Sequence, residues 1–323
     1  SPLSHHIAWV GLAQALLLGA EFVLDDPPDG ARPLDWIIET GATYVMGVPT
    51  HAIDLLAEQR RRGGQALGAV MVFYMAGAPI PPATAAAFLD QGITPQNIYG
   101  MTENSSHQYT HPDDDVDVIT STCGRGGPAY EVRIFRQDDP DIPAEAGAVG
   151  EIGGRGAALM LGYFADQAAT EAGFNRGGWF MSGDLGRLDA AGNLHIVGRA
   201  KDLIIRGGRN IHPARIENLA LTHPGVDKAA AFAVPDHRLG EKVCLAIVAA
   251  GDAAPGADGV LDHLHRSGLS KYDMPEYFIA LPEFPLTASG KIQKRDLAEA
   301  VKGGTISPQA VRFESLATSP GSS

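Results

Sequence analysis

Short apolar runs alternate with helix-starting residues between positions 44 and 99, and this alternation strongly limits the folds open to the chain. The three runs are Tyr44–Val48, Val70–Met75 and Ile93–Tyr99. The first run ends at Pro49, and Thr50 can cap a helix that follows it. Pro81 and Pro82 can open a helix after the second run, because proline is well tolerated in a first helical turn. The resulting β-α-β-α-β order predicts a largely parallel sheet with helices on its faces.

After residue 128 the pattern changes. The predicted strands Ala129–Phe135, Val149–Gly153 and Leu194–Val197 are separated by Gly-rich turns, with no long helix between them. This pattern indicates a small antiparallel or barrel-like subdomain. Beyond residue 200, short strands again alternate with helices, which predicts a compact α+β unit. Its elements are expected at Leu203–Ile205, after Pro213, and at Ala229–Val234, Val243–Ala249, Val260–Ser267 and Tyr277–Ala280.

Charge divides the chain at the same place. Residues 1–200 contain no lysine and carry 11 arginines against 24 acidic residues, whereas residues 201–323 balance 14 basic with 14 acidic residues. The change in charge indicates a domain boundary near residue 200. Together with the alternation of strands and helices, it predicts an α/β fold in which residues 1–200 form one domain, made of an α/β part (1–128) and a β-rich part (129–200). A small α+β domain over 201–302 and a flexible Ser/Gly/Thr/Pro-rich tail over 303–323 complete the expected organisation.

The composition excludes several classes of protein. A net charge of −13 argues against a nucleic-acid binder, which needs basic surface. The longest apolar stretch, Val10–Ala20, is too short for a transmembrane helix, which takes about 20 residues. Two cysteines, Cys123 and Cys244, exclude a disulfide scaffold and a Cys-rich metal site. The sequence starts without Met and without a basic leader, so we expect a cytoplasmic protein that is incomplete at its N-terminus.

Two candidate ligand-binding motifs lie within residues 1–200, and the first of them directly follows a predicted strand. Tyr99-Gly100-Met101-Thr102-Glu103 supplies an aromatic face for a base, a hydroxyl for a phosphate and a carboxylate for Mg²⁺. Asp184, after Ser182-Gly183, can accept hydrogen bonds from a ribose diol. Taken alone, the first motif is as well explained by an ordinary turn, and the second is better explained by one.

Two further motifs lie at and beyond the charge boundary. In the segment 198–208, Arg199 can bind a ribose or a phosphate in a forked geometry, and Gly207-Gly208 allows close approach of a thin ligand. A charged interdomain linker is the alternative. Lys291 lies in the loop 285–292, which is rich in small residues, and taken alone it is better explained as a solvated surface charge. This loop is not a Walker phosphate loop, because Pro285 and Ile292 occupy positions where that motif needs Gly and Ser or Thr.

In this order and spacing, the four motifs resemble those of the AMP-forming adenylating superfamily of acyl-CoA synthetases, luciferases and peptide-synthetase adenylation domains. The resemblance covers residues 1 to about 300 and includes two further segments. Gly77-Ala78-Pro79 is similar to the adenine-side loop, and Gly147–Gly156 with Met160–Tyr163 is similar to the family's "GE…RG…GY" segment. It implies the C-terminal part of a large α/β adenylating domain, followed by a small mobile C-terminal lid domain.

The resemblance also implies a role for each matching residue. Tyr99, beside Gly100 and Met101, would stack on adenine, and Gly77, Ala78 and Pro79 would flank it. Thr102 would contact phosphate and Glu103 would hold Mg²⁺. Asp184 and Arg199 would bind ribose, and Lys201 would be the hinge. Lys291 would bridge the carboxylate and the α-phosphate, because positive charge is needed where two anions meet.

Two departures from the family pattern stand out. The Ser/Thr/Gly-rich loop ending in Lys that wraps the β- and γ-phosphates has no match, and about 200 N-terminal residues of such a protein are expected to be missing. We therefore expect this chain to be inactive by itself. Arg215 replaces a usual Glu, which puts one local salt bridge in doubt.

The resemblance implies ATP-dependent formation of an acyl-adenylate and then a thioester with coenzyme A. The segment Pro2–Trp9 resembles the acyl-pocket lining, and His5 and Trp9 favour a ring or chain substrate over acetate. The stretch 102–107 is similar to that of ligases for cyclohexane-type or aromatic acids. No acidic residue lies between Ser1 and Ala20, which favours an acid without an α-amine. Gly207 and Gly208 would flank the pantetheine, and Arg206 and Arg209 would meet its phosphates.

Several alternatives stay open. The acceptor can be a carrier protein instead of coenzyme A, and the chain can be a non-catalytic nucleotide- or acyl-binding module. A homodimer is an open alternative to a monomer. The expected ligands are ATP or AMP, Mg²⁺, coenzyme A and a small carboxylic acid.

Overall fold

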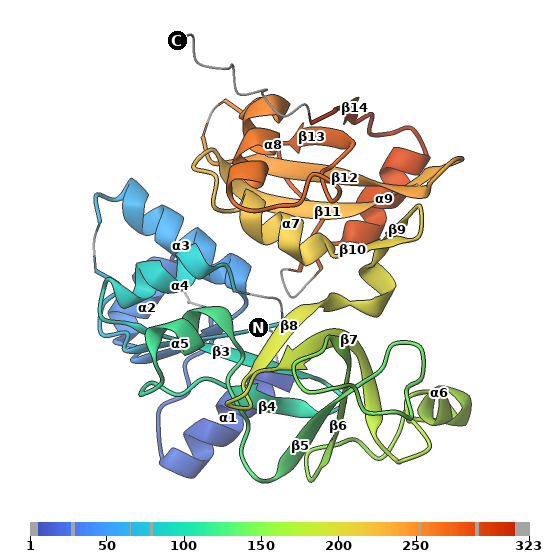
Figure 1. Cartoon of the computed structure of the whole chain (residues 1–323). Helices are drawn as coiled ribbons and strands as arrows, with labels where there is room; N and C mark the ends of the chain where they lie inside the picture. Colours follow the sequence, from blue (N-terminus) through green and yellow to red (C-terminus); the bar gives the residue numbers. More distant parts are fainter. Residues whose placement is uncertain are drawn as a thin grey trace, which may run out of the picture. The chain divides into compact units, whose positions relative to one another are not determined.

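The computed structural model describes residues 6–26, 30–64, 66–77, 80–251, 253–287 and 291–313. The chain divides into two compact units, Ser1–Ala200 with Ala288–Lys291, and Lys201–Thr287 with Ile292–Ser323. The main division lies between Ala200 and Lys201, where the charge balance of the sequence changes. The expected class, a mixed α/β fold with a small C-terminal part, is confirmed (Figure 1).

The first unit begins with an α/β layer. Its sheet has the order β1-β2-β3-β4, with β1 to β3 parallel and β4 antiparallel to β3. The strands are β1 Tyr44–Gly47, β2 Val72–Ala76, β3 Thr94–Met101 and β4 Ser105–Tyr109. The helices are α1 His6–Leu18, α2 Pro33–Thr40, α3 Pro49–Arg61, α4 Pro82–Leu89 and α5 Val116–Ser121. The predicted parallel sheet is confirmed, whereas polar β4 had no apolar run to indicate it.

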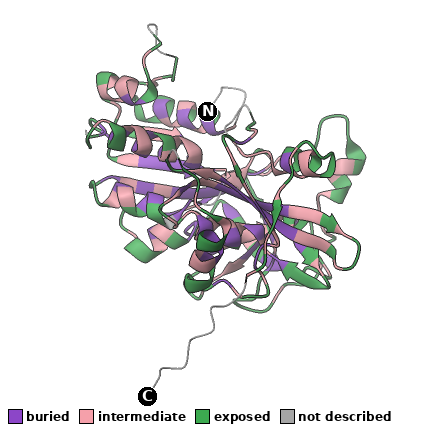
Figure 2. Cartoon of the chain, turned by 90° about the horizontal axis from the view of Figure 1, so that it is seen from above, coloured by how far each residue is buried: buried purple, intermediate pink, exposed green. Residues whose placement is uncertain are grey.

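Strand β2 shows how this sheet is covered. Phe73 and Met75 pack into the core formed with α2, α3 and α4, whereas Tyr74 and Ala76 pack with Ile7 of α1. Because successive side chains of a strand point to opposite faces, one apolar run can serve two cores. Figure 2 shows the buried residues concentrated along such strands, with exposed residues on the outer helix faces.

The β-rich part of the first unit is an antiparallel sheet of order β5-β6-β7-β8. Its elements are β5 Tyr130–Phe135, β6 Gly150–Gly156, α6 Gln167–Ala172, β7 Phe180–Leu188 and β8 Leu194–Arg199. Tyr99 of β3 belongs to the same apolar cluster as Ile134, Ile152 and Leu194 of this sheet. The end of β3 is therefore packed directly against the β-rich part.

The second unit is built on a mixed sheet of order β10-β9-β12-β13-β14, with β11 also paired to β12. Its elements are the 3₁₀ turn Ala200–Asp202, shared with the first unit, and β9 Ile204–Arg206, β10 Arg209–Ile211, α7 Pro213–Ala220, β11 Val226–Asp236, β12 Gly240–Ala249, α8 Ala257–Arg266, β13 Tyr277–Leu281, α9 Lys294–Lys302 and β14 Gln309–Ala310. Ala229 and Ala231 of β11 pack in one cluster with residues of α7 and α8, and Ala230 and Phe232 pack in another with Leu297 of α9.

Strand β14 corrects one expectation. Ala310 pairs with Tyr277 of β13, and the backbone N–H of Val311 donates to the carbonyl of Glu276 over 2.8 Å. Val311 and Phe313 pack against the core below. Residues 303–313 are therefore not the loose tail that their composition indicated, because edge pairing and two apolar side chains hold them. Residues 314–323 of that tail lie outside the described residues.

Candidate functional site

The site is built around the turn that joins β3 to β4. A Cβ added to Gly100 would lie 1.8 Å from the backbone oxygen of Ser105, so only glycine fits between the two strands. Ser105 itself has a φ of 58°, and Asn104 closes the turn by accepting a hydrogen bond from Met101 N–H over 3.0 Å. The sequence Gly-Met-Thr-Glu thus forms a tight turn at the carboxyl end of β3, where open α/β sheets bind ligands.

Tyr99, Asp184 and Arg199, which come from three separate sequence motifs, lie together in the structure. The Tyr99 hydroxyl donates to Asp184 Oδ2 over 3.0 Å, and Arg199 Nε donates to Asp184 Oδ1 over 3.0 Å. Asp184 and Arg199 are partners across the β7–β8 ladder, which fixes their register. Burial, followed by the charge of Asp184, raises the pKa of Tyr99 well above its ordinary value, so this phenol stays a donor.

Asp184 and Arg199 differ in how they face solvent. The Asp184 side chain is 9% exposed and the Arg199 side chain is 61% exposed, so the pair presents a guanidinium outward over a buried carboxylate. Ser182 supports the carboxylate segment, because its hydroxyl accepts from Asp184 N–H over 3.1 Å and donates to the Ile152 carbonyl. Only 8% of Tyr99 is exposed, so stacking of adenine on its ring, which needs an open face, stays a prediction.

Two residues that sequence reasoning missed lie behind Tyr99. His107 of β4 is 5% exposed, stacks on Tyr130 with ring centroids 4.1 Å apart and meets the edge of Tyr99 at 5.3 Å. Its two ring nitrogens have no hydrogen-bond partner among the described residues. Burial lowers the pKa of His107 to about 3, so the ring is neutral at ordinary pH. The polar sequence of β4 shows no apolar alternation, so it gave no signal that His107 is buried.

Glu103 is held by a segment from the β-rich part. Its Oε1 accepts from the Tyr163 hydroxyl over 3.0 Å, and its backbone oxygen accepts from Met160 N–H over 2.7 Å. Thr102 beside it is exposed. Among the described residues, no group of three or more His, Cys, Asp or Glu side chains could hold a metal ion. A single carboxylate suits Mg²⁺ that is bound chiefly through nucleotide phosphates and water, so Glu103 fits that role.

Lys291 groups with the first unit and lies beside Gly77. A Cβ added to Gly77, whose φ is 92°, would lie 2.9 Å from Lys291 Cε. Burial, followed by the positive charge of Arg199, lowers the pKa of Lys291, while the charge of Asp184 opposes this shift. The charges of Arg199 and Asp184 therefore both influence the Lys291 ammonium. Ala78 and Pro79, predicted beside adenine, lie outside the described residues.

In the second unit, Lys201 lies exposed in the 3₁₀ turn, and Gly207-Gly208 has a structural explanation. Arg206 pairs with Arg209 across a two-residue hairpin in which the glycines have φ of 58° and 82°. A turn of this kind needs positive φ at both central residues. Pantetheine contact at these glycines stays a prediction.

The two arginines predicted for coenzyme A phosphates already have protein partners. Arg206 pairs with Glu276 and donates to the carbonyls of Tyr272 and Met274, and Arg209 Nε lies 2.6 Å from Asp273 Oδ1. Arg215, which replaces a usual acid, donates to the Gly268 carbonyl over 3.0 Å. An anion at Arg206 or Arg209 would have to compete with a carboxylate.

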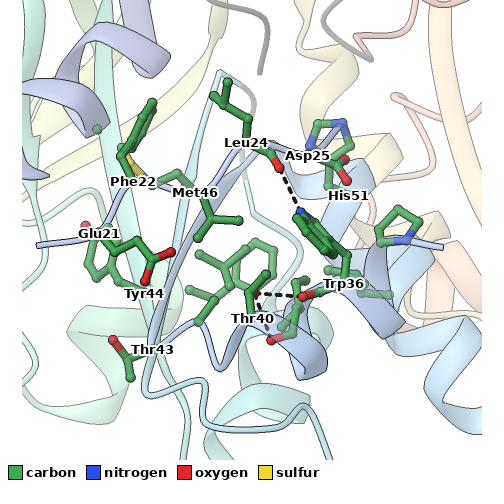
Figure 3. Close-up of a pocket in the computed structure, with 18 of the residues that line it drawn as sticks. Glu21, Phe22, Leu24, Asp25, Trp36, Thr40, Thr43, Tyr44, Met46 and His51 are labelled. Atoms are coloured by element: carbon green, nitrogen blue, oxygen red, sulfur yellow. Dashed lines mark hydrogen bonds between the residues drawn. The ribbon is translucent and has the colours of Figure 1, made fainter. Parts of the chain in front are cut away.

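At the acyl end, His5 lies outside the described residues, and Trp9 is 60% exposed on α1 while Ile7 beside it is buried. A cavity of about 1140 Å³ lies nearby, between α1, α2, α3 and β1 (Figure 3). Trp36 stands at its wall and donates from Nε1 to the Leu24 carbonyl over 2.8 Å. Neither Trp9 nor any described residue of the predicted nucleotide site lines this cavity.

Comparison with known proteins bears on these motifs. The family model "AMP-binding enzyme" matches residues 1–164, and the model "AMP-binding enzyme C-terminal domain" matches residues 215–291. Among the described residues, no helix is long and apolar enough to span a membrane.

Similar curated proteins act on different acids. A medium-chain fatty-acid–CoA ligase of Escherichia coli K12 is 33% identical over 298 residues, which cover 91% of this chain and 52% of the relative. A salicylyl-CoA synthase / salicylate adenylyltransferase of Streptomyces is 34% identical over 317 residues, covering 96% and 56%. The chain thus spans about half the length of the curated relatives that it matches.

Among solved structures, an ATP-bound RpMatB–BxBclM chimera has a TM-score of 0.82 at 30% identity, covering 94% of this chain and 59% of the other. An amide bond synthetase from Marinactinospora thermotolerans has a TM-score of 0.77 at 30% identity, covering 89% and 58%. With a family model matching more than half of its residues, the chain belongs to the AMP-binding enzyme family.

Proposed function

We propose that the whole protein activates a carboxylic acid with ATP to an acyl-adenylate and then transfers the acyl group to coenzyme A. The observation that carries this proposal is the cluster of Tyr99, Asp184 and Arg199 at the carboxyl end of β3. The names of the similar ligases, which include medium-chain fatty-acid, salicylyl and feruloyl CoA enzymes, support the same reaction class.

In this proposal the nucleotide lies over the β7–β8 ladder. Asp184 accepts from the ribose hydroxyls and Arg199, already outward-facing, binds ribose or phosphate oxygen. Thr102, exposed in the turn, contacts phosphate, and Glu103 offers an oxygen to Mg²⁺, which neutralises charge on the phosphates. Gly77, Gly100 and Met101 shape the adenine side around Tyr99.

Lys291 brings the positive charge that joining two anions requires. The substrate carboxylate attacks the α-phosphate, its oxygen forms the new bond to phosphorus, and pyrophosphate leaves. An ammonium placed between the two anions offsets their repulsion in the transition state. Burial of Lys291 strengthens this effect, because a charge screened less by water interacts more strongly.

The acid and the acceptor are the less constrained parts of the proposal. The absence of an acidic residue from positions 1–20 favours an acid without an α-amine. The acceptor is coenzyme A, and Gly207 and Gly208 of the second unit flank its pantetheine. Lys201 is the hinge of this unit. Loading of a carrier protein and a non-catalytic nucleotide-binding module are the alternatives. A cytoplasmic location and a homodimer stay predictions.

Calorimetric titration of the 323-residue chain with AMP and with ATP tests the nucleotide site. We expect weak binding of both by the wild type and at least a 10-fold loss for Asp184→Asn, because the amide cannot accept at both positions. Asp138→Asn, at an exposed carboxylate paired with Arg136, is the control and should bind as the wild type does. Equal binding by Asp184→Asn and wild type would remove the basis of the proposal.

A further inference from the structure

The loop that follows β6 touches the candidate metal ligand in two places. Glu103 and Tyr163 are 60 residues apart in sequence, yet the Tyr163 hydroxyl donates to Glu103 Oε1 over 3.0 Å. Three residues earlier in the same loop, Met160 N–H donates to the Glu103 backbone oxygen over 2.7 Å. Both the main chain and the side chain of Glu103 are therefore held from the β-rich part of the first unit.

Polar contacts, not apolar packing, fix the shape of this loop. Tyr163 N–H donates to Thr170 Oγ1 over 2.9 Å, and the Thr170 hydroxyl in turn donates to the Asp166 carbonyl over 2.8 Å. A Cβ added to Gly162 would lie 2.9 Å from Thr170 Cγ2, so the loop lies close against α6. The side chains of Leu161 and Phe164, on either side, are fully exposed. The loop thus presents Tyr163 on a fixed support.

A glutamate at a turn has several rotamers, and a hydrogen bond to one carboxylate oxygen selects among them. A hydroxyl bonded to an ionised carboxylate is among the stronger hydrogen bonds in proteins. Glu103 Oε2 makes no hydrogen bond to another described residue, so one oxygen stays available while the other is fixed. Mg²⁺ demands near-ideal octahedral geometry, so its binding responds to the placement of each ligand oxygen.

We propose that Tyr163 is a positioning residue that holds the Glu103 carboxylate in place for the Mg²⁺ of the bound nucleotide. This inference rests on the proposed function, which assigns Mg²⁺ to Glu103. It adds a residue from the loop after β6 to a site that already includes groups at the end of β3 and in the β7–β8 ladder. Tyr163 itself touches neither nucleotide nor metal in this arrangement.

The test is calorimetric titration of the chain with ATP across a series of Mg²⁺ concentrations. We expect Tyr163→Phe to raise the half-saturating Mg²⁺ concentration about 3- to 10-fold, the range of one net hydrogen bond. Affinity for ATP without metal should be unchanged. Tyr272→Phe is the matched control, because the Tyr272 hydroxyl makes no hydrogen bond to another described residue and should leave the Mg²⁺ series unchanged.

A double-mutant cycle separates positioning from a merely structural role. In the Glu103→Gln background, Tyr163→Phe should cause no further change in the Mg²⁺ series. A full, additive effect of Tyr163→Phe in that background would overturn the inference, as would an equal loss of metal-free ATP affinity. If wild type responds to Mg²⁺ and Tyr163→Phe responds identically, the inference fails while the proposed function stands. If Glu103→Gln has the same Mg²⁺ dependence as wild type, the metal role of Glu103 fails first.

Discussion

Lys291 is the residue on which the proposed chemistry depends most. We expect Lys291→Ala in the complete protein to slow acyl-adenylate formation about 100- to 1000-fold, since losing one charged transition-state contact costs about 2.7–4 kcal/mol. Thioester formation from supplied acyl-adenylate should change little, because the two anions are already joined. Pyrophosphate exchange measures the first step, and exposed Lys302→Ala on α9 is the control. Exchange at the wild-type rate in Lys291→Ala would contradict the assignment.

Gly100 offers a test of the turn beneath the site. Gly100→Ala places a Cβ against the Ser105 backbone oxygen, so we expect the free energy of unfolding to fall by about 2–4 kcal/mol. Gly259 of α8 is the matched control, because nothing lies within 4 Å of an added Cβ there. Gly259→Ala should stabilise by about 0.5 kcal/mol, since alanine favours helix. Urea denaturation of both variants compares them, and a neutral Gly100→Ala would contradict the close approach.

At the scale of elements, His107 of β4 and Tyr130 of β5 join the two sheets of the first unit through a stacked contact. The folded pKa of His107 is about 3, below the ordinary histidine value of 6.5, so the unfolded chain binds a proton that the folded chain does not. Stability from this residue is therefore complete above pH 6.5 and is lost progressively as the pH falls toward 3.

We expect His107→Phe, which keeps an aromatic ring but has no titrating group, to lose this pH dependence. Over that window the wild type should lose up to about 1.4 kcal/mol of unfolding free energy per pH unit more than the variant. Urea denaturation as a function of pH gives the comparison. His237→Gln, at an exposed position, should keep the wild-type slope. Parallel curves for His107→Phe and wild type would show that His107 is not buried neutral.

At the scale of the whole molecule, the chain divides between Ala200 and Lys201, where we propose a hinge. The hinge would let the second unit take one arrangement for adenylation and another for thioester formation. Proline fixes φ near −65°, so Lys201→Pro should favour one arrangement of the units and impair one half-reaction about 10-fold more than the other. Lys201→Ala, which removes the charge but keeps the backbone free, is the control. Separate assays of adenylation and thioester formation in the complete protein decide this, and equal losses in both argue against a hinge.

The exposed leucines of α1 predict how the 323-residue chain behaves in solution. Leu16, Leu17 and Leu18 are 75%, 86% and 80% exposed, beside the cavity under this helix. Contiguous exposed apolar surface favours association, so we expect the chain to self-associate and Leu17→Glu to shift it toward monomer. Sedimentation velocity measures the effect. Leu161→Glu, at another exposed leucine, should leave association unchanged, and a monomeric wild type would contradict the prediction.

Local sequence determined the elements whose signals are local. Pro49 and Pro82 are the first residues of α3 and α4, and the three predicted apolar runs became β1, β2 and β3 within two residues of their predicted bounds. Thr50, expected to cap the first of these helices, lies inside it, because the N-cap is Val48. Gly207 and Gly208 allow the two-residue turn between β9 and β10, because glycine adopts the positive φ of this turn without a steric penalty. The order and spacing of the motifs were enough to indicate the family, which the match to its family model confirms.

Only the tertiary structure decided which distant side chains meet. β4 has no apolar run, and it became a strand because β3 offered it a partner edge. Tyr163 contacts Glu103, and Tyr99 contacts Asp184 across 85 residues, because packing of the two sheets sets those distances. Residues 309–310 became a strand for the same reason. A propensity acts within a few residues, whereas pairing and burial act between segments that only the folded chain brings together.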